Sequence, residues 1–172
     1  TTTYEEEKAP MEGCEAWSRE LRGQQMVSHG APGGVIHDYS LRLFAERGYI
    51  ASSNWRDSDG PFIHELDGKK IPLVELPKDS IFDDTAYDFY TDSAPERYEL
   101  KSPGEMLEIW KEEFDSLAAE GRMINFVLHP QFIGRVSRVN MLKELIGYML
   151  SKGAWIATNR EAAQWVLKES GM

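Results

Sequence analysis

The sequence is poor in the features that mark several common protein classes. It has a single cysteine, Cys14, in 172 residues, so an internal disulfide is excluded and a reducing compartment, the cytoplasm, is expected. No apolar run reaches the roughly 20 residues that a membrane-spanning helix needs, and the first residues resemble no secretory signal. We therefore expect no membrane partner. The absence of an initiator methionine favours a trimmed chain or a piece of a longer one.

Positive charge is also scarce. The chain has 19 lysines and arginines against 29 aspartates and glutamates, for a net charge of −10. Phosphate backbones repel such a chain, and no aromatic residues alternate with a basic stripe. Nucleic acid is therefore not an expected partner.

Motifs for several chemistries are missing. The four histidines show no i, i+4 pairing and there is no Cys-x-x-Cys, so we expect no self-contained metal site in this chain. No glycine-rich dinucleotide fingerprint or phosphate loop follows a strand, which argues against a nucleotide site. No Gly-x-Ser-x-Gly elbow indicates a serine hydrolase.

What the sequence does contain is an alternation of strand and helix signals. Apolar spacing and capping residues predict helices at 10–21, 38–48, 103–120 and 137–152, and a last one after Thr158. Short apolar runs predict strands at 26–28, 49–51, 71–76, 123–128 and 154–157. In the first helix, Pro10 is expected at the first helical position, with one buried stripe made by Met11, Cys14, Trp17 and Leu21. The alternation predicts an α/β fold.

The number of strand–helix units suggests an incomplete structure. The run 123–128 is almost continuously apolar, as expected of a parallel strand covered on both faces. About four such units are too few to close a barrel of seven or eight. Because an open half would expose strand edges, something else should cover them. We expect one partial domain over 1–172.

Candidate site residues follow from the rule that ligands gather where parallel strands end. His129 directly follows the run 123–128 and could transfer a proton, or simply cap the strand end. Asp83 and Asp84 could orient a histidine or bind a metal, or be ordinary loop carboxylates. Arg135 and Arg138 could hold an anion or a carboxylate, or be surface charges.

Three stretches also carry a resemblance to a known family. They are Ala31-Pro32-Gly33-Gly34 followed by Leu43 to Tyr49; Leu73 to Pro77 with Asp83-Asp84; and Phe126-Val127-Leu128-His129-Pro130, continuing through Arg135 to Trp155-Ile156-Ala157-Thr158. In this order they resemble the third, fourth and last motifs of the polysaccharide deacetylase (NodB-like) family, over nearly the whole chain.

This resemblance implies a metal-dependent hydrolase of amide bonds on a distorted (β/α) barrel. In this family one aspartate and two histidines hold the metal and a neighbouring aspartate acts as base. The resemblance implies that His129 protonates the leaving amine and that Asp83 or Asp84 tunes the catalytic groups. It also implies a substrate pocket lined by Ala31, Pro32, Gly33 and Gly34; we add Arg135 to the predicted substrate-binding residues.

The departures from the family pattern shape the functional hypothesis. The motifs that carry the base and the metal ligands lie upstream in the family and are absent here. Gly30 stands where the family has an arginine, which favours the allantoinase and cyclic-imide-hydrolase branch. We therefore expect half of a hydrolase for a sugar or small-molecule amide. A second polypeptide would complete the hydrolase in a hetero-oligomer and bring a divalent metal, for which zinc is the first expectation. The alternatives are a non-catalytic binding or structural remnant, and a fragment of an ordinary enzyme.

Overall fold

The computed structural model describes residues 3–37, 39–56, 58–88 and 100–172, which form two compact units. Unit 1 contains Thr1–Trp55, Pro61–Leu76 and Ala157–Met172. Unit 2 contains Arg56–Gly60 and Pro77–Ile156. None of the helices in the described ranges has the length and apolar character that crossing a bilayer requires.

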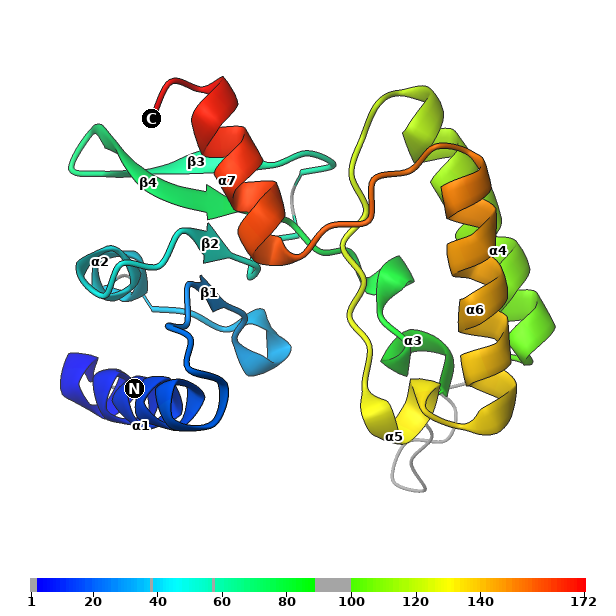
Figure 1. Cartoon of the computed structure of the whole chain (residues 1–172), viewed down its shortest axis with the longest axis horizontal. Coiled ribbons are helices and arrows are strands. Elements are labelled where there is room, and N and C mark those ends of the chain that lie inside the picture. Colours follow the sequence, from blue (N-terminus) through cyan, green and yellow to red (C-terminus); the bar gives the residue numbers. More distant parts are fainter. Residues whose placement is uncertain (1–2, 38, 57, 89–99) are drawn as a thin grey trace. The chain divides into compact units, whose positions relative to one another are not determined.

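Unit 1 is built on a four-stranded sheet of order β1-β2-β4-β3 (Figure 1). β1 (Ser28–His29), β2 (Ala51–Ser52) and β4 (Lys69–Glu75) are parallel neighbours, close to the predicted strands at 26–28, 49–51 and 71–76. β3 (Phe62–Leu66) pairs antiparallel with β4 and was not predicted. Its signal is the Asp67-Gly68 turn, in which both residues have positive φ, as tight hairpins require.

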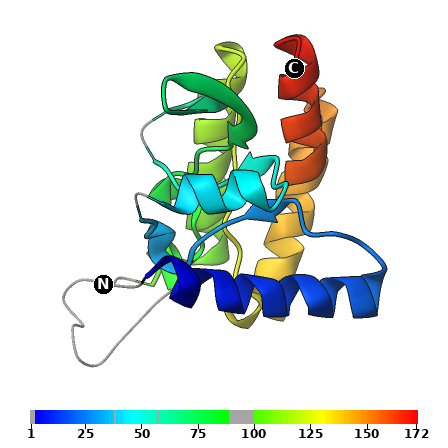
Figure 2. The same ribbon diagram turned by 90° about the vertical axis from the view of Figure 1, so that its left-hand side faces the viewer.

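Two helices of unit 1, α2 (Ser40–Glu46) and α7 (Asn159–Glu169), pack on this sheet. The unit also contains α1 (Tyr4–Arg22) and the short 3-10 turn η1 (Pro32–Gly34). α2 and α7 contact β4, and α1 lies beside α2 (Figure 2). The core of the unit consists of Met11, Leu43, Phe44, Tyr49 and Leu73. The predicted cap at Asp38 lies outside the described residues.

The prediction for the first helix is wrong in two respects. α1 begins at Tyr4 rather than at Pro10, because Thr3 and Glu6 form a capping box. The predicted stripe is also not buried: Met11 is, but Cys14 is exposed, Trp17 is 64% exposed and Leu21 is 61% exposed. The helix instead turns a mixed face inward, with Met11, Glu15 and Ser18, because Arg47 of the neighbouring segment binds Glu15.

Unit 2 is organised around two long helices, α4 (Pro103–Ala119) and α6 (Val136–Ser151), which contact each other. The unit also contains the short elements η2 (Ser80–Phe82), α3 (Thr85–Asp88) and α5 (Pro130–Ile133); α5 contacts α6, and α3 contacts η2 (Figure 1). The predicted capping boxes Ser102–Glu105, before α4, and Thr158–Glu161, before α7, are both confirmed. The buried residues Met106, Trp110, Phe114 and Leu145 form the centre of the core.

The strands predicted at 123–128 and 154–157 are wrong for this structure. The run 123–128 is half-buried rather than covered on both faces, and its one ladder contact is a parallel bridge between Val127 and Asp83. Ala154–Ala157 is irregular, with Trp155 61% and Ile156 51% exposed. Apolar sequence alone does not make a strand, because each strand also needs a neighbour to accept and donate its backbone hydrogen bonds.

Candidate functional site

The bridge at Val127 brings two distant segments of unit 2 together. The backbone N–H of Asp84 donates to the carbonyl of Val127 at 3.1 Å, and the N–H of Val127 donates to the carbonyl of Phe82 at 3.0 Å. Aromatic packing supports this crossing: the ring of Phe126 lies 5.4 Å from that of Phe82 and 5.1 Å from that of Trp110. The crossing therefore places Asp83 and Asp84 beside the end of the run 123–128, which His129 directly follows.

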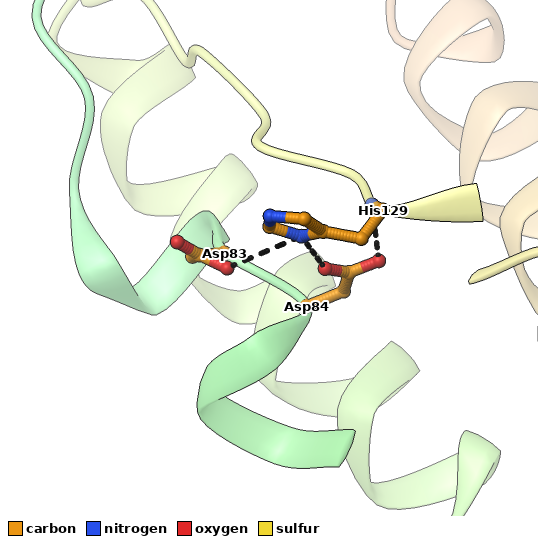
Figure 3. A group of neighbouring side chains, drawn as sticks. All are labelled: Asp83, Asp84 and His129. Carbon is orange, nitrogen blue, oxygen red and sulfur yellow. Dashed lines mark hydrogen bonds and ion pairs between the residues drawn. The ribbon is translucent and has the colours of Figure 1, made fainter. Parts of the chain in front are cut away.

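Asp84 binds His129 through both carboxylate oxygens. Oδ2 accepts the backbone N–H of His129 at 2.8 Å, and Oδ1 lies 2.6 Å from the ring Nδ1. The Asp84 side chain is completely buried, whereas that of His129 is 35% exposed. Figure 3 shows that the second ring nitrogen, Nε2, points away from Asp84. Because a carboxylate only accepts hydrogen bonds, this contact favours the tautomer with the proton on Nδ1, and Nε2 is the nitrogen that faces away from Asp84.

Asp83 has a different local role. Its Oδ1 accepts the backbone N–H of Thr85 at 3.0 Å and the Thr85 hydroxyl at 2.5 Å, so it caps the short helix α3. Its distance from Nδ1 of His129 is 3.8 Å, too long for a hydrogen bond. Of the two predicted aspartates, Asp84 is therefore the one that orients the histidine.

The backbone that follows His129 turns sharply. The carbonyl of His129 accepts the N–H groups of Phe132 and Ile133, at 2.9 and 3.0 Å, which starts α5. A Cβ atom at Gly134 would lie 2.3 Å from the carbonyl oxygen of Pro130, so only glycine fits there. Arg135 follows as the exposed N-cap of α6. Arg138 is buried, and its guanidinium donates to the carbonyl of Lys101 at 2.5 Å, so it is not a surface charge.

The same three side chains are the group of described residues that could hold a metal. Ligand atoms of Asp83, Asp84 and His129 lie within 4.8 Å of one another. Both oxygens of Asp84 already accept hydrogen bonds from His129, and Oδ1 of Asp83 accepts two from Thr85. A carboxylate oxygen has two lone pairs, so one that accepts a hydrogen bond can also coordinate an ion. The three residues therefore form a hydrogen-bonded group and also a candidate metal site. The expectation that this chain has no metal site of its own stays a prediction.

Of the predicted pocket residues, Pro32, Gly33 and Gly34 form the turn η1 of unit 1 and Ala31 directly precedes it, whereas His129 and Asp84 belong to unit 2. Gly33 and Gly34 have φ of 67° and 72°, and the N–H of Gly34 donates to the carbonyl of Ala31 at 2.9 Å. This geometry explains both glycines, because side chains rarely adopt the left-handed region. Their role in binding substrate stays a prediction, as does that of Arg135.

Unit 1 contains a polar cluster that the sequence reasoning missed, made of Ser52, Asn54, His64 and Glu75. All four side chains are buried, and Glu75 has no exposed surface. Burial alone would raise the pKa of Glu75, but hydrogen bonds from His64, Ser52 and the backbone of Asn54 and Trp55 lower it. The signal in the sequence was Glu75 itself, a charged residue inside the apolar run 73–76, which requires buried partners.

No protein-family model matches this chain, and no curated protein sequence matches it. Solved structures do. A protein assigned as a polysaccharide deacetylase from Mycobacterium smegmatis matches with a TM-score of 0.87 and 23% identity, over 96% of this chain and 58% of that one. The fold is that of a partial NodB-like domain.

Two further structures agree. A protein assigned as a polysaccharide deacetylase from Pseudomonas aeruginosa PAO1 matches with a TM-score of 0.78 and 24% identity, over 97% of this chain and 55% of that one. Puue allantoinase matches with a TM-score of 0.73 and 23% identity, over 94% of this chain and 53% of that one. The predicted α/β fold of the partial NodB-like type is thereby confirmed, and this chain spans little more than half the length of these neighbours.

Proposed function

We propose that this partial NodB-like chain belongs to an amide hydrolase in which His129 is the general acid. The observation that carries the proposal is the Asp84–His129 pair. A buried carboxylate fixes one ring nitrogen, and the other faces away from it on a partly exposed side chain. This is the arrangement that a proton donor to a leaving group needs.

The reaction is the addition of water to an amide carbonyl followed by cleavage of the C–N bond. The nitrogen leaves as a neutral amine only if it gains a proton as the bond breaks. His129 delivers that proton from Nε2, while its Nδ1–H stays hydrogen-bonded to Asp84. The products are a carboxylic acid and an amine, or a ring-opened acid where the amide is cyclic. An acetylated sugar and a cyclic imide or ureide are the two substrate classes under this proposal.

The remaining chemistry is assigned to a second polypeptide that carries the other part of the barrel. A divalent metal bound there, zinc in first place, would activate water and stabilise the negative charge on the carbonyl oxygen. Two observations support an incomplete site in this chain: the coverage of only 53–58% of the neighbours, and the exposure of Trp155 and Ile156. The cytoplasm stays the predicted location.

A second candidate function is binding without hydrolysis. Gly30 stands where the family pattern has an arginine, and the family motifs that carry the base and the metal ligands are absent from this sequence. A binding or structural remnant of the domain would keep the fold but would not depend on a histidine that transfers protons.

The test is to assay hydrolysis by the complex purified from its source, with His129→Gln compared against the wild type. Release of acetate from an acetylated amino sugar and opening of a cyclic imide are measured separately. His129→Gln should lower kcat by roughly 10²–10⁴-fold with little change in KM, because proton donation is lost while binding is kept.

His37→Gln is the matched control, since it makes the same chemical change at a half-buried histidine of unit 1. It should leave kcat within about twofold of the wild-type value. Equal activity of His129→Gln and the wild type would exclude the general-acid role. A metal-loaded complex that binds an amide but releases no product would favour the binding function.

A further inference from the structure

The side chain of Asn54 joins the turn that begins at Ala31 to the segment that follows β2 in unit 1. The backbone N–H of Ala31 donates to Oδ1 of Asn54 at 2.7 Å, and this bond is buried. Ala31 is the residue that precedes η1, and its own side chain is 8% exposed. The position of the whole Pro32–Gly34 turn therefore depends on where Asn54 is held.

Asn54 is held at both its amide group and its backbone. Its side-chain Nδ2 donates to the hydroxyl of Ser52 at 2.8 Å. Its backbone N–H donates to Oε1 of Glu75 at 2.5 Å, and the next N–H, of Trp55, donates to the same oxygen at 2.9 Å. The Asn54 side chain is thus fixed in orientation as well as in place, with Oδ1 directed at Ala31.

Glu75 is the centre of this arrangement. It lies at the end of β4, is completely buried, and its second oxygen, Oε2, lies 2.9 Å from Nε2 of His64. Buried carboxylates are costly unless their oxygens accept hydrogen bonds, and the bonds accepted by Glu75 lower its pKa despite burial. Because the backbone N–H groups of Asn54 and Trp55 both donate to this buried carboxylate, Glu75 fixes the position of that backbone more strongly than apolar packing would.

We propose that Asn54, oriented by Glu75, is the positioning residue for the substrate-lining turn Ala31–Gly34. This inference rests on the proposed function and on the predicted role of that turn in lining the substrate pocket. Asn54 acts through Ala31 and has no role in proton transfer. Its loss should therefore weaken substrate binding and leave the chemical step intact.

The first measurement does not require activity. Hydrogen exchange of the backbone amides is followed by mass spectrometry in the wild type and in Asn54→Ala. The variant leaves the Ala31 N–H without its buried acceptor, so peptides covering 29–35 should exchange about tenfold faster. Peptides from β4 should keep their protection. Unchanged exchange at 29–35, or an equal loss over all of unit 1, would overturn the proposal.

The conservative variant Asn54→Asp keeps an acceptor oxygen for Ala31 and should restore slow exchange at 29–35. Where Asn54→Ala fails to fold, Ser52→Ala replaces it, because it frees the Asn54 amide but keeps Oδ1 present. It should raise exchange at 29–35 by about threefold, and wild-type exchange there would overturn the proposal.

The second measurement is steady-state hydrolysis by the complex. Asn54→Ala should raise KM about tenfold with kcat within about twofold, and Asn54→Asp should return KM toward the wild-type value. A lowered kcat with unchanged KM would contradict the positioning role. Absence of hydrolysis in the wild type would refute the proposed function and leave the exchange result to decide whether Asn54 fixes the turn.

Discussion

The carboxylate of Asp84 is completely buried, and both of its oxygens accept hydrogen bonds from His129, one from the backbone and one from the ring. Through these two bonds the carboxylate fixes the position and orientation of the ring. Under the proposed function, Asp84 is therefore a positioning residue and His129 is the group that touches the substrate.

At this scale we expect the two adjacent aspartates to behave differently. Asp84→Asn should lower kcat about 10²-fold, because an amide in place of the carboxylate no longer holds the Nδ1–H tautomer in place. Asp83→Asn keeps the oxygen that caps α3, so kcat should stay within about threefold. Steady-state hydrolysis by both variants checks this; equal losses would mean that the two carboxylates share one role.

The sequence supplied His129 and both aspartates as candidates but could not choose between the aspartates. Position alone left a strand-end cap and a loop carboxylate as alternatives, and the family resemblance named the pair together. The choice depends on which side chain faces the ring, and that follows from the crossing at Val127. The crossing pairs Asp83 with Val127, and it thereby brings together Asp84 and His129, which are 45 positions apart.

Among the elements, α1 and the segment after α2 are joined by a partly buried ion pair. Arg47 donates to Glu15 from Nε at 2.7 Å and from a terminal nitrogen at 2.5 Å. These hydrogen bonds lower the pKa of Glu15 below its ordinary value, although burial acts in the opposite direction. The pair replaces the apolar stripe that helical spacing predicted for α1.

This pair predicts how stability depends on pH. Because the pKa of Glu15 is lower in the folded chain than in the unfolded one, its contribution is complete above the unfolded pKa, about 4.3, and is lost as the pH falls through the folded value. The free energy of unfolding, measured by urea titration from pH 6 to pH 3, should therefore fall more steeply in the wild type than in Glu15→Gln.

Glu20→Gln, a change at an exposed position of α1, is the matched control and should follow the wild-type slope. Glu75 also has a lowered pKa and contributes to acid sensitivity in every variant alike. If the free energy of unfolding depends on pH equally steeply in Glu15→Gln and in the wild type, the Glu15–Arg47 pair does not contribute to the loss of stability in acid.

At the scale of the whole molecule, two observations describe an incomplete barrel. The solved structures that match this chain over 94–97% of its length are themselves covered only to 53–58%. Within the described part of unit 2, the run 123–128 pairs with a neighbouring segment only through the isolated bridge between Val127 and Asp83. Trp155 and Ile156 are largely exposed. A strand-like segment with unpaired backbone N–H and C=O groups can form hydrogen bonds with a strand from another segment.

Native mass spectrometry of the untagged protein from its source, paired with metal analysis, tests this. We expect a second polypeptide of about a hundred residues or more and one equivalent of a divalent metal. Chelation of the metal should abolish hydrolysis while leaving the helices of this chain folded, as measured by circular dichroism. A metal-free monomer or self-dimer would contradict the two-chain hydrolase.

The sequence by itself determined the features that depend on neighbours within about one helical turn. The capping boxes at Ser102 and Thr158, the helices that follow them and the glycine-rich turn before Val35 were all readable, because their hydrogen bonds join residues three or four positions apart. The family-like motifs also pointed to His129.

Only the tertiary structure decided the rest. The pairing of Asp84 with His129, the burial of Glu75 with Asn54 and the mixed inner face of α1 all require hydrogen bonds between residues 21 to 45 positions apart. The same holds for the run 123–128, whose apolar residues suit a strand but whose backbone has a ladder only where a neighbour lies alongside. Local sequence sets the preference of a segment, and its distant partners determine whether that preference is realised.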